Sequence, residues 1–106
     1  MSDFQISWPR QGANDRARDS IAAFLVIDIQ RSPDWAKDLL AKIADVRMGV
    51  LPSWERIGNA YRLYLTAEGG LIEDRIDSTN APQRFPVEEL EAAVTAWLAA
   101  IGSAEG

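Results

Sequence analysis

The sequence has 106 residues, of which 47% are hydrophobic and 25% are charged, and its formal net charge is −5 at pH 7. This length and composition fit one globular domain, residues 1–106, with one modest core. The acidic balance argues against a nucleic-acid groove and against adhesion to anionic membranes, and the lack of Cys excludes disulfides, thiolate chemistry and Cys-based zinc sites.

Two elements are expected near the N-terminus. Apolar and polar residues alternate over residues 4–8, which predicts a half-buried strand, with an ordered extended arm as the alternative. A helix is predicted to begin near Asp15, and its apolar residues from 17 to 25 form an inward stripe. The end of this helix is open, because the β-branched residues of 26–29 also suit an extended chain.

A second helix has a strong start signal in Ser32-Pro33-Asp34. Ser is a good N-cap, Pro suits the first helical position, and the acid suits the first turn. Apolar residues follow at spacings of three and four from Ala36 to Val46, and Gly49 is placed to end the helix.

The middle of the chain then changes to the period of two that is typical of strands. Strands are predicted over 54–57, 61–66 and 71–76, and Glu68-Gly69-Gly70 is predicted to form the hairpin turn before the last of them. These three strands make an antiparallel meander, which gains a fourth strand if residues 4–8 join it.

A polar loop is expected over residues 77–84, followed by a helix that begins near Pro86 and ends at Gly102. Its apolar stripe runs from Val87 to Ile101. The predicted fold class is therefore α+β, a small antiparallel sheet of three to four strands packed on one face by about three helices.

No catalytic signature is visible. The chain has no His, so the usual Ser or Cys relay cannot be built, and the glycines of the hairpin lack the spacing and Lys of a phosphate-binding loop. A divalent cation between Glu73 and Asp77 is possible, but a solvated sheet face explains these acids better. We expect a protein that is not an enzyme and that has no cofactor or metal.

The net negative charge lies in the last third of the chain. From Glu68 onward there are eight acids and two bases, a balance of −6, whereas the first 67 residues hold eight acids and nine bases, a balance of +1. Such asymmetry predicts a surface that selects partners by charge. We expect an acidic binding face made by seven residues: Glu68, Glu73, Asp74, Asp77, Glu88, Glu89 and Glu91.

The aromatic residues divide between core and surface. Trp97 lies on the stripe of the last helix and is expected in the core. Trp35 and Trp54 suit either core or surface, with the core favoured. Tyr64 alternates with the inward residues of its strand, so it is expected to be exposed near the acids. Exposed Tyr is enriched at interface centres, which makes it a possible anchor.

The run SWERIGNAYRLYL from Ser53 to Leu65, with the turn and Leu71-Ile72-Glu73 after it, resembles a pattern in small bacterial immunity proteins. These are the CdiI-type proteins of contact-dependent growth inhibition systems. A similar Trp-x-x-x-Gly-x-x-Tyr run before an acidic strand occurs in the YacL-like family. The resemblance covers the meander and implies a small α+β domain that binds and neutralises a cognate toxin domain. Many such toxins are nucleases with basic clefts.

The sequence therefore predicts a cytoplasmic immunity protein. Its expected partner is the C-terminal domain of a toxin, bound through the acidic face, with neither nucleic acid nor membrane as a direct partner. The alternative is a YacL-like cytosolic adaptor that binds an unrelated protein.

Overall fold

The structure, a computed structural model, describes residues 15–105 and has the α+β architecture that the sequence predicts. The predicted strand at residues 4–8 lies outside the described residues. In chain order the elements are α1 (Asp15–Phe24), the π-helical turn η1 (Leu25–Ile29), α2 (Pro33–Arg47), β1 (Ser53–Ile57), β2 (Tyr61–Thr66), β3 (Gly69–Asp74), β4 (Gln83–Phe85) and α3 (Val87–Glu105).

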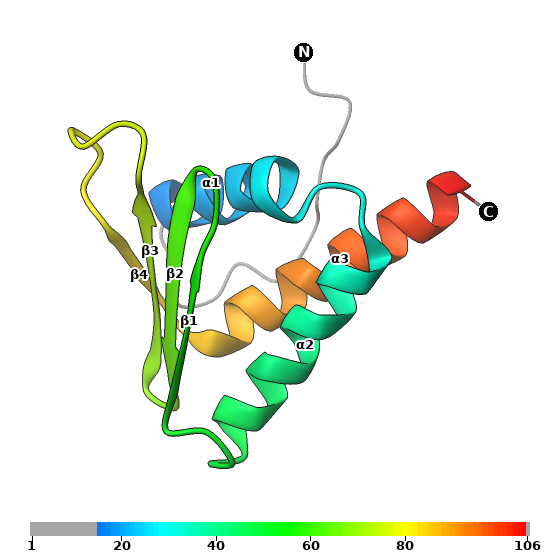
Figure 1. The fold of residues 1–106 in the computed structure, drawn as a ribbon, viewed down its shortest axis with the longest axis horizontal. Coiled ribbons are helices and arrows are strands. Elements are labelled where there is room, and N and C mark those ends of the chain that lie inside the picture. The colour runs from blue at the N-terminus through cyan, green and yellow to red at the C-terminus, as the bar shows by residue number, and fades with distance from the viewer. Residues whose placement is uncertain (1–14, 106) are drawn as a thin grey trace.

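The four strands form one antiparallel sheet in the order β1-β2-β3-β4, and the helices all lie on one of its faces (Figure 1). The inner face of the sheet is apolar, with Leu63 and Leu65 of β2 and Ile72 of β3 buried against the helices. Because side chains alternate along a strand, the neighbours of these residues point to the opposite, outer face. The sheet therefore has one covered face and one face without helices.

The helical stripes supply the rest of the core. The stripes that the sequence predicts on all three helices are buried, except for the partly buried Leu40 and Leu98, and Trp97 of α3 is 2% exposed. Trp54 packs partly buried against the core. The core was favoured for Trp35 as well, and this prediction is wrong, because Trp35 lies in the first turn of α2 and is 49% exposed.

Two helix ends follow their local signals, one was left open by the sequence, and one departs from its signal. The Ser32 side chain accepts a hydrogen bond from the backbone of Trp35, and Gly49 follows α2 with a left-handed φ of 79°. After α1 the chain does not become extended but continues as η1. The helix α3 runs through Gly102 to Glu105, so the prediction that it ends at Gly102 is wrong.

The loop predicted over 77–84 is wrong at its end, where residues 83–85 form β4 and pair with β3. Phe85 drives this pairing, since it is 4% exposed and lies opposite Gly70. A Cβ atom on Gly70 would sit 2.4 Å from the Phe85 ring, so only glycine leaves room for it. The two hairpin glycines accordingly belong to β3, and the turn lies at Ala67 and Glu68.

Candidate protein-binding surface

The seven acids expected on one face are spread over the molecule. Glu68 lies in the β2–β3 turn, whereas Asp74 ends β3 and Asp77 follows it in the loop. A six-residue strand is roughly 20 Å long, so Glu68 and Asp74 lie at opposite ends of the sheet. Glu88 and Glu91 belong to the helical layer on the other side. The structure therefore does not bring these residues together.

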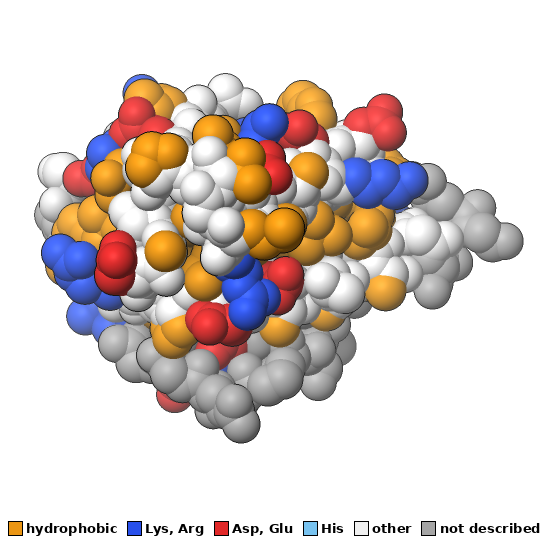
Figure 2. Space-filling model, turned by 90° about the horizontal axis from the view of Figure 1, so that it is seen from below, with side chains coloured by type: hydrophobic (Ala, Val, Ile, Leu, Met, Phe, Trp, Pro, Cys, Tyr) orange, Lys and Arg blue, Asp and Glu red, His pale blue; other side chains and the backbone are white. Residues whose placement is uncertain are grey.

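Several of these acids are also paired with bases. Glu91 forms a hydrogen-bonded ion pair with Arg47 of α2, and Glu88 lies 3.9 Å from the same guanidinium. Arg62 pairs with Glu73 across the sheet at 3.6 Å. On the face shown in Figure 2, the acidic side chains form separate groups between basic and hydrophobic ones. A single continuous acidic face is therefore not present there.

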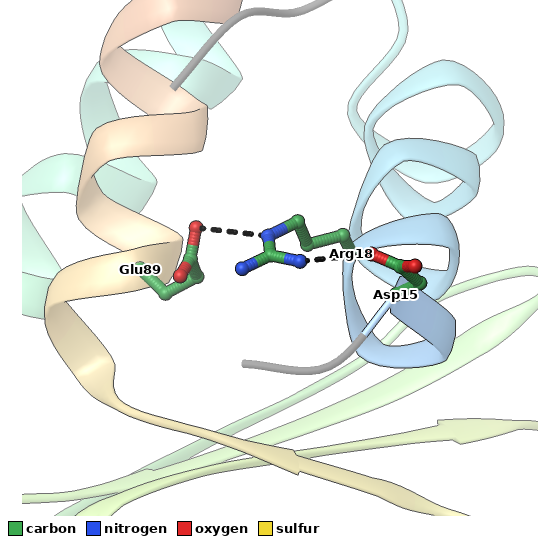
Figure 3. Close-up of polar contacts among 3 residues, drawn as sticks. All are labelled: Asp15, Arg18 and Glu89. Atoms are coloured by element: carbon green, nitrogen blue, oxygen red, sulfur yellow. Dashed lines mark hydrogen bonds and ion pairs between the residues drawn. The ribbon is translucent and has the colours of Figure 1, made fainter. Parts of the chain in front are cut away.

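Glu89 is not a surface residue at all. Its side chain has no exposed area, and its Oε2 lies 3.8 Å from Nε of Arg18 (Figure 3). The Nη1 of Arg18 lies 3.0 Å from Oδ1 of Asp15. Within the described part of the chain, neither Glu89 oxygen has a hydrogen-bond partner, and neither has the Arg18 Nε. The pair joins α1 to α3, and a buried pair with such geometry contributes little net stability. The prediction that Glu89 belongs to an acidic binding face is therefore wrong, because α1 packs against this side of α3.

Asp74 and Asp77 organise the loop after β3. Asp74 Oδ1 accepts hydrogen bonds from the backbones of Asp77 and Ile76, both at 2.9 Å, and its Oδ2 accepts one from the Asn80 amide. These bonds favour the charged carboxylate, so the bond from Asp77, then those from Asn80 and Ile76, lower the pKa of Asp74. Both residues fit a structural role, since Asp77 likewise binds Thr79.

We expect the Asp74→Asn variant to lose less stability in acid than the parent protein. A depressed folded pKa means that the carboxylate stabilises the fold above about pH 4, where the unfolded Asp is charged. This contribution disappears as the pH falls through the folded pKa. Thermal unfolding from pH 7 down to pH 2 measures it, and parallel pH profiles for the two proteins would contradict it.

Asp28 is an interior acid that sequence reasoning missed. It is 1% exposed, and its two oxygens accept hydrogen bonds from the backbones of Ala60 at 3.0 Å and Tyr61 at 2.9 Å. It thereby fixes the β1–β2 connection to η1. The sequence does carry a signal for it, since Asp28 is a single acid inside a long apolar run. An acid in such a run is expected to be buried, and a buried carboxylate needs hydrogen-bond donors from elsewhere in the chain. Its role is structural.

The outer face of the sheet has none of the described helices over it (Figure 1). The register sets one row of side chains across all four strands: Glu55, Tyr64, Leu71 and Arg84. Tyr64 and Leu71 occupy the two central strands, and the charged residues occupy the edges. An apolar and aromatic centre with a charged rim is the arrangement found in protein–protein interfaces.

Tyr64 is half-buried on this face, and Arg62 helps to hold it. The Arg62 guanidinium lies 5.7 Å from the centre of the Tyr64 ring and is bound by Glu55 on β1 and Glu73 on β3. The hydrogen bond from Arg62 to Glu55 is the largest cause that raises the pKa of Arg62. The ring is thus positioned before any partner binds, which lowers the entropy cost of association.

A hollow of about 500 Å³ opens beside Tyr64 at the β2–β3 end of the sheet. Leu71 gives it an apolar wall, and Glu68 and Arg84 place opposite charges along it. Gly69 points no side chain into it. A Cβ atom at Gly69 would lie 2.9 Å from the Phe85 carbonyl oxygen, so a larger residue does not fit at this position without a shift of the backbone.

Among residues 15–105, no group of three His, Cys, Asp or Glu side chains is placed to hold a metal ion. No helix in the described part of the chain is long and apolar enough to cross a membrane. No protein-family model, curated protein or solved structure matches this chain.

Proposed function

We propose that this protein is a binding module that neutralises a toxin domain, as a cytoplasmic immunity protein, and that it does so through the outer face of its sheet. The observation that carries the proposal is the row from Glu55 to Arg84, with Tyr64 and Leu71 at its centre and a hollow beside them. A rigid aromatic anchor beside a hollow is typical of the few residues that dominate binding energy.

This surface differs from the one that the charge pattern predicts. Of the residues expected in the acidic face, only Glu68 and Glu73 lie on or beside it, together with the anchor Tyr64. Glu55 adds an acid from β1, and Arg84 and Arg62 add two bases. Contact specificity therefore comes from shape and mixed charge, while the net charge of −5 acts at longer range.

The partner that fits is a toxin domain with a basic surface, such as a nuclease with a cleft for its substrate. A net charge of −5 accelerates encounter with such a domain and is screened by salt. Glu68 offers a contact, because it is exposed at the turn and forms no ion pair with any described residue. Inhibition by binding also requires no chemistry from this chain.

The test is to determine whether a reading frame next to this gene encodes a toxin domain, and to co-express that domain with the full chain. We expect the full chain to restore growth of cells that produce that domain, and the purified pair to elute as one complex whose affinity falls as NaCl rises. Growth arrest that persists despite equal expression of both proteins would contradict the proposal. A complex without rescue would point instead to an adaptor.

A further inference from the structure

The two edges of the sheet are protected differently. The β4 edge has three residues and lies between Pro82 and Pro86, which cannot donate backbone hydrogen bonds to an added strand. The β1 edge has five residues and no proline within it, and a single proline, Pro52, precedes it. Among the described residues, β1 pairs only with β2. Within residues 15–105, no strand covers the outer edge of β1.

The register identifies which backbone groups of β1 are unpaired. The Gly58 N–H donates to the Tyr61 carbonyl at 2.9 Å, in continuation of the β1–β2 register. Because backbone groups of an antiparallel strand point alternately to its two sides, those of Ser53, Glu55 and Ile57 point away from β2. These three residues present a row of donors and acceptors.

Exposed hydrophobic side chains lie at both ends of β1. Ile57 ends the strand and is 58% exposed, and Trp35 lies near this end, with its ring 5.7 Å from the guanidinium of Arg56. Val50 and Met48, in the segment that leads into the strand, are 64% and 77% exposed. An antiparallel copy of β1 would bring the apolar start of one strand beside the apolar end of the other.

We infer that this protein forms a symmetric dimer in which β1 pairs antiparallel with β1 of a second copy, so that the two sheets become one. The inference does not depend on the proposed function, since it uses the unpaired backbone of the β1 edge, although Glu55 also belongs to the outer-face row. The second copy is the occupant that fits, because two-fold symmetry matches each apolar end of the edge with the other.

Charge selects one register of this pairing. The inner and outer faces of the sheet continue into the second copy only if one residue of β1 lies directly opposite the same residue of the other copy. The residues that can take this central position within β1 are Trp54, Glu55 and Arg56. Pairing centred on Glu55 or Arg56 sets two like charges directly opposite each other, which is unfavourable. Pairing centred on Trp54 sets Trp54 against its copy and Ser53 against Glu55 of the second copy, with no like-charge pair.

The test is sedimentation equilibrium of the full chain from about 10 µM to about 1 mM. We expect the average mass to rise from that of one chain toward that of two, and dimerisation to strengthen with NaCl, because salt screens the repulsion between two copies of net charge −5. A monomer at every concentration and salt would overturn the inference.

Paired variants test the register. Ser53→Lys creates two favourable contacts, one in each copy, with Glu55 of the other copy, so we expect the dimer dissociation constant to fall about fivefold. Ser53→Glu makes the same two contacts unfavourable, so we expect the dissociation constant to rise about fivefold. Ser53 is exposed, so both variants should fold. The controls Thr95→Lys and Thr95→Glu make the same charge changes on the exposed surface of α3. Equal effects at the two positions would overturn the Trp54-centred register.

Discussion

Replacing Asp28 with Ala is expected to lower the free energy of unfolding by about 3 kcal/mol. The substitution leaves the backbone N–H groups of Ala60 and Tyr61 without their acceptor, and each unsatisfied buried donor costs about 1–3 kcal/mol. Part of this loss is offset, because the variant no longer keeps a carboxylate away from water. Urea denaturation of the two proteins measures the difference.

Two further variants separate this role from a general effect of charge. Asp28→Asn retains one acceptor oxygen but turns an amide N–H₂ toward the second donor, so we expect an intermediate loss of about 2 kcal/mol. Asp38→Ala removes an exposed acid from α2 and should change stability by less than about 0.5 kcal/mol. Equal stability of the Asp28→Ala and Asp38→Ala proteins would show that Asp28 does not hold the β1–β2 connection.

Replacing Trp97 with Ala is expected to cost about 4 kcal/mol, the usual range for deleting a buried Trp side chain. Trp97 is 2% exposed in the centre of the core, and its Nε1 donates a hydrogen bond to the Gln30 carbonyl at 2.7 Å. The side chain thus joins α3 to the residue that follows η1. Thermal unfolding monitored by circular dichroism measures the loss.

Trp97→Phe keeps most of the packing and removes the indole N–H, so its cost should be about 1–2 kcal/mol. Trp35→Ala is the matched truncation on the surface, where the side chain is 49% exposed, and should cost less than about 1 kcal/mol. If Trp35→Ala were as destabilising as Trp97→Ala, the assignment of these two residues to surface and core would be wrong.

The elements with strong local signals were predictable from the sequence. The cap at Ser32 and the spacing from Ala36 to Val46 predicted α2, and the alternation in β2 predicted which of its residues face the core. The strand β4 was not predictable in this way, because three residues carry no usable period. It exists through one distant contact, the Phe85 ring against Gly70.

The binding face was less predictable than the fold, because charge along a sequence does not say where side chains lie in space. Glu89 lies off the apolar stripe of α3, yet α1 buries it. A signal was present, since Ala93 lies one turn further on the same flank and is fully buried. Small residues let a second helix approach closely. Tyr64 was placed on the outer face correctly, because its strand alternates cleanly.

The most direct test of the account is the affinity of the Tyr64→Ala protein for the toxin domain, compared with that of Trp35→Ala. Both residues are aromatic and each ring lies 5.7 Å from an Arg guanidinium, but Tyr64 is on the outer face and Trp35 is on the helical side. We expect the dissociation constant to rise at least about 30-fold for Tyr64→Ala, as for an interface anchor, and less than about threefold for Trp35→Ala. Unchanged affinity of the folded Tyr64→Ala protein would contradict binding through the outer face.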